Sequence, residues 1–161
     1  MQEWIEQLNA IDGIIATPNS KIASHTPLRV GGSVDAWVRC QSRNALKKAM
    51  PLIRKQNWKV HSPFQDCLFR DGTLTGILLR LEGEFEQITQ TEDSIQLGSS
   101  ALWTALHPQG LGASFHSWPG SVGGLFEDRP EKYLKNLDIE VEWFSGRSFQ
   151  FALQYVYRDG E

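Results

Sequence analysis

Two glycine-containing segments carry the residue types best suited to holding an anion. Residues 26–32 read Thr-Pro-Leu-Arg-Val-Gly-Gly, and residues 117–124 read Ser-Trp-Pro-Gly-Ser-Val-Gly-Gly. Consecutive glycines let backbone N–H groups approach an anion such as a pyrophosphate, because no Cβ atom stands in the way. Taken singly, each segment is better explained as a tight turn. The residues therefore indicate an anion site only when the two segments are considered together.

The sequence gives less support to a metal site or a catalytic nucleophile than to an anion site. The four histidines, His25, His61, His107 and His116, lie in separate segments, and none has a cysteine or carboxylate partner at metal-ligand spacing. We expect no metal site and read these residues as ordinary polar histidines. No nucleophile elbow or activated cysteine supports a catalytic triad.

Composition excludes several classes of partner. The chain has 161 residues, of which 40% are hydrophobic and 22% charged, and its 16 Lys and Arg against 19 Asp and Glu give a net charge of −3. No basic block interrupts this mixture, so we predict no nucleic-acid partner. The apolar runs fall short of the roughly 20 residues that span a bilayer, so we predict no membrane insertion. The absence of a signal-peptide pattern and of a Cys-x-x-Cys pair between Cys40 and Cys67 predicts a cytoplasmic protein.

Hydrophobic periodicity predicts a first lobe of βαββ order. Residues 36–40 and 58–61 have the pattern of short strands, and residues 76–81 that of a strand buried on both faces. Ser42 can cap a helix between them, in which Pro51 predicts a kink or a late start. A further helix opens the chain and carries its apolar residues on one face: Trp4, Ile5, Leu8 and Ile11. The helix after Ser42 has the same spacing at Leu46, Ala49, Met50 and Ile53.

The second half is richer in strand signals. Strands are indicated at residues 85–89, 94–97, 137–143 and 149–153. The first two flank Glu92 and Asp93 as a hairpin would, and residues 101–107 have the pattern of a short helix. We therefore expect an α+β fold of two lobes, residues 1–82 and residues 83–161.

Read in order, these segments resemble the MurB family, the UDP-N-acetylenolpyruvoylglucosamine reductases (UDP-N-acetylmuramate dehydrogenases) of peptidoglycan synthesis. Residues 25–32 are similar to its Thr-x-x-x-Gly-Gly signature, and residues 68–72 with 76–81 to the segment after its flavin loop. Residues 110–112 resemble its Gly-Leu-x-Gly element. The most specific match, to Ile-Pro-Gly-x-Val-Gly-Gly, covers Pro119, Gly120, Ser121, Val122, Gly123 and Gly124. Near the end, Phe151, Tyr157, Arg158 and Asp159 resemble its Phe-x-Tyr-Arg-Asp-Ser motif.

The resemblance implies a two-lobed flavin-binding fold of the vanillyl-alcohol-oxidase type, a βαββ lobe with a larger antiparallel-sheet lobe. In that family FAD lies between the lobes, NADPH reduces it, and hydride passes to the enolpyruvyl group of a UDP-sugar. A serine then donates a proton, while an arginine and a glutamate stabilise the intermediate. By this resemblance Gly31, Gly32 and residues 119–124 occupy cofactor-binding positions.

The flavin loop departs from the family pattern. The family's Gly-Gly-Gly-Ser-Asn, whose amides hold the FAD pyrophosphate, aligns with Ser62, Pro63, Phe64, Gln65 and Asp66. Proline has no N–H, phenylalanine places a ring where glycine admits phosphate, and aspartate adds negative charge beside a diphosphate. Losing several amide donors at about 1.5–3 kcal/mol each would weaken FAD binding by orders of magnitude. We therefore predict that the chain has no cofactor and that its cofactor-binding positions are vestigial.

Two further departures concern the substrate. Residues 125–130 do not match the family's Gln-Asn-x-Gly-Ala-Tyr-Gly, which lines flavin and substrate. The sequence stops at Glu161, so the resemblance implies no counterpart for the family's C-terminal substrate domain, its serine proton donor or its glutamate. Tyr157 and Arg158 match a substrate-contacting pair and are read as vestigial, because Gly160 replaces the serine of the motif. A naturally short chain and a fragment both remain open.

The favoured hypothesis is a MurB-like pseudoenzyme, a non-catalytic binding or regulatory module linked to peptidoglycan synthesis. The alternatives are an FAD-dependent reductase completed by a second chain, and a nucleotide-sugar sensor. We expect bulky residues to fill the former flavin space, drawn from Phe64, Phe115, Trp118 and Phe126. We also expect a homodimer or a protein partner, with residues 137–144 and 149–157 as the contact surface. The residues do not identify a small-molecule ligand.

Overall fold

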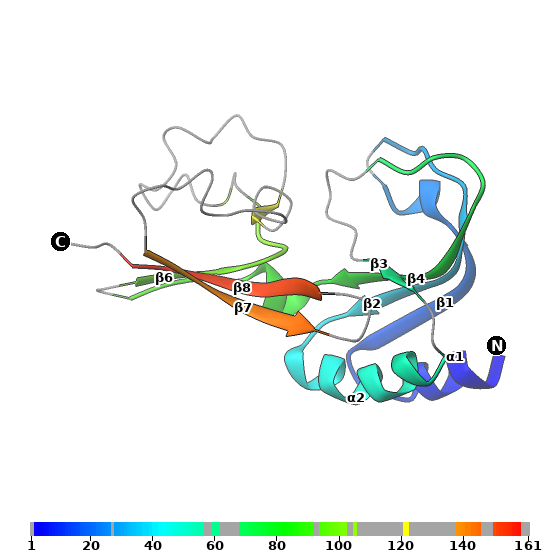
Figure 1. Ribbon diagram of the computed structural model, residues 1–161, viewed down its shortest axis with the longest axis horizontal. Helices are drawn as coiled ribbons and strands as arrows, with labels where there is room; N and C mark the ends of the chain where they lie inside the picture. The colour runs from blue at the N-terminus through cyan, green and yellow to red at the C-terminus, as the bar shows by residue number, and fades with distance from the viewer. Residues whose placement is uncertain are drawn as a thin grey trace.

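The computed structural model describes residues 2–26, 28–56, 59–61, 68–91, 94–102, 105, 121–122, 138–145 and 150–158. These residues form two four-stranded sheets that lie next to each other along the longest axis of the molecule (Figure 1). The first sheet is mixed and the second antiparallel. The chain is therefore an α+β protein, as the sequence predicts.

The first sheet has the order β1-β2-β4-β3. Its strands are β1 (Ile14–Lys21), β2 (Ser33–Cys40), β4 (Thr73–Leu81) and β3 (Val60–His61). Strands β2, β3 and β4 run parallel, and β1 pairs with β2 in the opposite direction. A short 3-10 helix, η1 (Ile22–Ser24), follows β1.

Strand β1 is absent from the predicted βαββ order, which is therefore incomplete. Pro18 lies inside it, and Asn19 has a positive φ of 46°. Both residues break the apolar–polar alternation by which a strand is recognised in a sequence. Proline is tolerated because β1 lies at the sheet edge, where one side of the strand needs no ladder donors.

Helices α1 (Gln2–Asn9) and α2 (Arg43–Lys55) cover one face of the first sheet. The Ser42 Oγ atom accepts a hydrogen bond from Ala45 N at 3.1 Å, which confirms the predicted cap. The helix runs from Arg43 through Pro51, so the expectation of a late start is wrong. The side chains of both helices pack on the apolar residues of β2 and β4 that face them.

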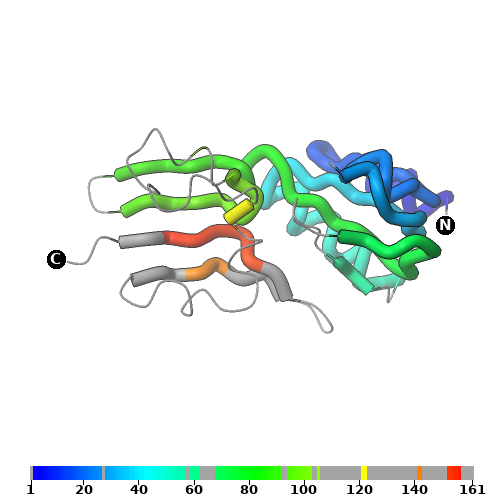
Figure 2. Tube along the Cα trace, turned by 90° about the horizontal axis from the view of Figure 1, so that it is seen from above, coloured from blue at the N-terminus to red at the C-terminus, as the bar shows by residue number. Residues whose placement is uncertain are grey.

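The second sheet has the order β5-β6-β8-β7 and is seen from above in Figure 2. Its strands are β5 (Ile88–Gln90), β6 (Ser94–Gly98), β8 (Gln150–Arg158) and β7 (Asp138–Ser145). The antiparallel pairing of β5 with β6 confirms the predicted hairpin. A short helix was predicted for residues 101–107. This prediction is wrong at Leu102, which forms an isolated antiparallel bridge with Ser121.

The prediction of a strand that begins at Phe85 is also wrong. Residues Gly83–Glu86 form a second 3-10 helix, η2, and β5 begins only at Ile88. The turn buries Phe85 completely in the core beneath the first sheet. Gly83 allows this turn because its φ is +61° and an added Cβ would lie 2.6 Å from the Gln41 carbonyl oxygen.

The two sheets share a core and a polar joint. Phe85 and Leu153, from the second half of the chain, belong to the same buried cluster as the side chains of α1 and α2. On the surface, Arg43 of α2 donates to Glu142 of β7 at 3.0 Å and to Gln154 of β8. Among the described residues, no helix is long and apolar enough to cross a membrane.

Candidate functional site

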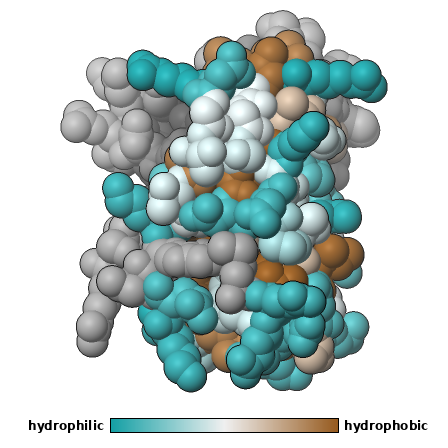
Figure 3. Space-filling view, turned by 90° about the vertical axis from the view of Figure 1, so that its right-hand side faces the viewer, coloured by the Kyte–Doolittle hydropathy of each residue, from teal (hydrophilic) through white to brown (hydrophobic). Residues whose placement is uncertain are grey.

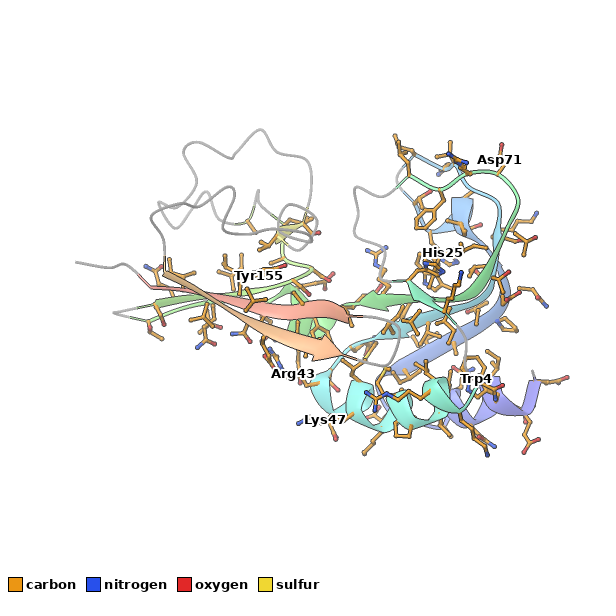
Figure 4. The ribbon with its side chains drawn as sticks, in the orientation of Figure 1. Trp4, His25, Arg43, Lys47, Asp71 and Tyr155 are labelled. Carbon is orange, nitrogen blue, oxygen red and sulfur yellow. The ribbon has the colours of Figure 1, made fainter. Side chains whose placement is uncertain are left out.

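Two rows of side chains lie on the face of the first sheet away from α1 and α2. This face is called the helix-free face because neither α-helix covers it; only the short 3-10 helix η1 packs there, through Ile22. Strand pairing aligns one row of residues across this face: Thr17, Trp37, Leu78 and His61. The neighbouring row contains Ile15, Arg39 and Arg80. Figure 4 shows His25 on this side of the sheet, with Trp4 and Lys47 on the helical side.

An aromatic stack occupies the first row. The His25 and Trp37 rings lie 4.2 Å apart between centroids and 18° from parallel. His25 Nε2 and Ser20 Oγ are 2.8 Å apart and share a hydrogen bond. Trp37 is 2% exposed and packs in a small apolar cluster with Ile22, Val34 and Leu78. The helix-free face thus has its own core, separate from the one beneath the helices.

Burial is the main reason that the pKa of His25 is lowered from 6.5. The positive charges of Arg39 and Arg80 lower this pKa further, and Glu82 acts in the opposite direction. Neutral His25 is therefore the form that the folded protein favours.

The second row holds two arginines that share one carboxylate. Arg39 Nη2 lies 2.7 Å and Arg80 Nε 3.1 Å from oxygens of Glu82. Arg39 Nε also donates to both Glu82 oxygens, at 2.9 and 3.0 Å, and this hydrogen bonding raises the Arg39 pKa. The side chains of Arg39 and Arg80 are 41% and 29% exposed, so both guanidinium groups reach solvent.

Gly31 and Gly32 lie where two loops touch. An added Cβ at Gly32 would overlap the Gly72 backbone, and one at Gly31 would lie 2.9 Å from the Phe69 Cβ. Gly31 also has a positive φ of 112°. The Gly32 N–H donates to the Arg70 carbonyl at 3.2 Å. Close packing between the two loops therefore explains this glycine pair, and its role as a cofactor contact stays a prediction.

Several known proteins are similar to this chain, and they share one name. No family model matches the chain. A UDP-N-acetylenolpyruvoylglucosamine reductase from Anoxybacillus flavithermus is 32% identical over 89% of the chain and 57% of the relative. Proteins of the same name are 30% identical in Halalkalibacterium halodurans, over 77% of the chain and 44% of the relative, and 28% identical in Bacillus subtilis, over 94% and 57%. Over most of its length the chain is therefore similar to one part of the MurB proteins. It spans about half the length of the curated relatives that it matches.

The glycine signature most specific to MurB proteins covers residues 119–124, and the structure describes only two of them. Ser121 and Val122 are buried, and Val122 N donates to the Ala101 carbonyl at 2.8 Å. The rest of this signature, Pro119, Gly120, Gly123 and Gly124, lies outside the described residues. So do the flavin-loop positions Ser62, Pro63, Phe64, Gln65 and Asp66, and the predicted space-filling residues Phe115, Trp118 and Phe126.

Tyr157 and Arg158 lie at the end of β8. Their backbones pair with Ile95 and Ser94 on one side and with Ile139 and Asp138 on the other. This end of β8 leads to the C-terminus at the left of Figure 1, whereas β1, β2 and the loop of Gly31 and Gly32 are at the right. Within the described part of the chain, these two parts of the MurB signature are not brought together.

Arg39, Arg80 and Glu82 are not among the site residues predicted from the sequence. The available signal was an arginine at the second-last position of two apolar strands, in Ala-Trp-Val-Arg-Cys and Ile-Leu-Leu-Arg-Leu. Only the parallel register of β2 and β4 makes Arg39 and Arg80 neighbours. Among the described residues, no group of three or more His, Cys, Asp or Glu could hold a metal ion.

Proposed function

We propose that this chain is a MurB-related binding or regulatory module linked to peptidoglycan synthesis, built on the two-lobed flavin-binding scaffold and without reductase activity. The observation that carries the proposal is the sequence of residues 62–66, where Pro63, Phe64 and Asp66 replace the small and neutral residues of a pyrophosphate loop. The altered loop removes amide donors and adds a negative charge beside a diphosphate. The names of the relatives support the link to their pathway.

The decisive experiment measures flavin. The purified protein should be colourless, and titration with FAD should give no bound-flavin absorbance at micromolar concentration. A triple variant, Pro63→Gly, Phe64→Gly and Asp66→Asn, should gain FAD affinity, because it restores backbone access and removes the repelling carboxylate. A yellow wild-type preparation would overturn the proposal.

The second candidate is an FAD-dependent UDP-N-acetylenolpyruvoylglucosamine reductase, completed by a further chain or segment. The name of the relatives and the sequence match at Tyr157 and Arg158 favour it. A nucleotide-sugar sensor would use the same two residues. Binding of a UDP-sugar that is lost in Arg158→Gln, with FAD still unbound, would select the sensor over both the reductase and a module without a ligand.

A further inference from the structure

An aspartate followed by a glycine lies in the loop that leads into β4. Asp71 and Gly72 are both exposed, and Figure 4 shows Asp71 on the side of the first sheet away from α1 and α2. Within the described part of the chain, no hydrogen bond or ion pair holds the Asp71 carboxylate, and the Gly72 N–H donates no hydrogen bond. The carboxyl carbon of Asp71 and the backbone nitrogen that follows it are therefore both free to react with each other.

The fold requires a glycine at position 72. Its φ is 114°, which residues with a side chain rarely adopt, and no atom of the described residues lies within 4 Å of the place where a Cβ would stand. A side chain at this position would shield the backbone nitrogen, and glycine has none. The conformation that makes Gly72 necessary thus also leaves its nitrogen unshielded.

An exposed Asp-Gly pair rearranges without an enzyme or a cofactor. The Gly72 nitrogen forms a bond to Asp71 Cγ, and one carboxyl oxygen leaves as water with the amide proton and the carboxyl proton, which closes a succinimide ring. Water then adds to the ring. Opening at the side-chain carbonyl regenerates aspartate, and opening at the main-chain carbonyl gives isoaspartate, in which the backbone runs through Cβ and Cγ. No electrons are exchanged, and the water that is released is taken up again.

A second described Asp-Gly pair, Asp12–Gly13, is held more tightly. The Ile14 N–H donates to the Ile11 carbonyl at 3.0 Å, so a hydrogen-bonded turn encloses both residues of the pair. Gly13 is half-buried, and an added Cβ would lie 3.2 Å from the Ala45 Cβ. Because the turn restricts the movement that ring closure needs, we expect the folded protein to suppress the reaction at this second pair.

The backbone around Gly72 has no room for an additional methylene group. Ser33 N donates to the Gly72 carbonyl at 2.8 Å, and Gly32 N donates to the Arg70 carbonyl at 3.2 Å. These two hydrogen bonds hold the carbonyls on both sides of Asp71 against the start of β2. Isoaspartate lengthens the main chain between these carbonyls by one methylene group, so both hydrogen bonds cannot keep their geometry.

We propose that Asp71–Gly72 is a site of spontaneous isoaspartate formation, and that the product loosens the contact between the loops of Gly32 and Gly72. It is a modification site whose occupancy increases with the age of the protein. The proposal does not rest on the proposed function, because the reaction needs neither FAD nor a partner.

Peptide mapping of aged protein tests the proposal. The full chain is kept folded for weeks at physiological temperature and mildly acidic pH. Isoaspartate is then located by chromatography with mass spectrometry, and is confirmed by methylation with a protein-isoaspartyl methyltransferase. It should accumulate at Asp71 and much more slowly at Asp12. Asp71→Glu should abolish the signal at position 71, since glutamate keeps the charge but would have to close a larger ring. Asp12→Glu is the matched control and should leave the Asp71 signal unchanged.

The unfolded chain provides the reference for the effect of the fold. In concentrated urea Asp71 and Asp12 should react at similar rates, because the structure that distinguishes the two pairs is lost. The pair Asp159–Gly160 lies outside the described residues and does not enter the comparison. No isoaspartate at Asp71 in the aged folded protein, or equal accumulation at Asp71 and Asp12 there, would overturn the site.

Hydrogen exchange measures the structural consequence. The Ser33 amide should exchange faster in aged wild-type protein than in fresh protein, whereas aged Asp71→Glu should keep the slow exchange. Circular dichroism checks that this variant folds, and Asp71→Ser replaces it if it does not. Unchanged exchange of the Ser33 amide in molecules that contain isoaspartate would contradict the proposed loosening.

Discussion

At the scale of single residues, His25 links protonation to stability. Its ring stacks on Trp37, bonds to Ser20 and faces the charges of Arg39 and Arg80. Because its folded-state pKa is below 6.5, the unfolded chain takes up the proton more readily. This contribution to stability is therefore complete above the unfolded pKa and is lost as the pH falls toward the folded pKa.

We predict that the free energy of unfolding falls as the pH is lowered from about 7.5 to about 5, and that His25→Phe flattens this dependence. Phenylalanine keeps a ring on Trp37 and cannot take up a proton. Urea unfolding at a series of pH values measures the effect, with Lys47→Gln as a variant that should keep the wild-type slope. An unchanged slope in His25→Phe would show that His25 does not carry the linkage.

Cys40 also has a shifted pKa. Desolvation by burial raises its pKa to about 11, and its thiol donates to the Ser42 carbonyl at 3.3 Å. At about pH 8, roughly one thiol in a thousand would be ionised at such a site. In a Cys67→Ser variant, Cys40 is the one remaining thiol. We predict that iodoacetamide modifies it only after unfolding, as mass spectrometry would record; rapid labelling of the native protein contradicts this.

At the scale of elements, the first residue of α2 fastens the first sheet to the second. The Arg43 backbone N–H donates to Glu84 Oε2 at 2.8 Å, and its guanidinium reaches Glu142 and Gln154. The guanidinium carbon also lies 5.6 Å from the centre of the Phe85 ring. These contacts join α2, η2, β7 and β8 on the surface above the shared core.

We predict that Arg43→Ala lowers the free energy of unfolding by about 1–2 kcal/mol, through one partly exposed ion pair and one cation–π contact. Leu153→Ala should cost more, about 2–4 kcal/mol, because Leu153 is 5% exposed and lies in the core itself. Chemical unfolding of both variants measures the difference. A larger loss in Arg43→Ala than in Leu153→Ala would mean that the joint, and not the core, holds the sheets together.

The elements also show what the sequence can predict. Helix α2 was predictable because a capping serine and four apolar residues at helical spacing agree. Strand β1 was not predictable, because Pro18 and Asn19 interrupt the alternation of apolar and polar residues. Its partner β2 also follows only after a loop, so the pairing of the two strands leaves no local pattern. The same limit applies to the site: the close approach of Gly32 to Gly72 and the pairing of Arg39 with Arg80 depend on register between distant segments, which local periodicity does not contain.

At the scale of the whole molecule, large apolar side chains of the described residues remain at the surface in three places, one of which is Leu102, 37% exposed. Leu28, Val30 and Leu68 are 68%, 45% and 72% exposed, on the loops that continue from β1 and toward β4. Figure 3, which views this end of the molecule, shows apolar residues at its top edge between hydrophilic ones. Ile15, 43% exposed, lies on the helix-free face. The second sheet differs, because Glu142 and Gln96 on one of its faces are exposed.

The polar character of that face determines how the expected homodimer would form. Face-to-face packing of Glu142 and Gln96 would bury polar groups at a cost, which favours association of this sheet through its edge. The described second sheet has two edge strands, β5 with three residues and β7 with eight, and an unpaired edge is a template for a further strand, so the longer β7 offers more backbone groups for pairing. We therefore predict a homodimer through β7, with twice the 18.2 kDa mass of the chain in light scattering at micromolar concentration. A wild-type protein that stays at the monomer mass at every concentration would rule out self-association and leave β7 for a different partner.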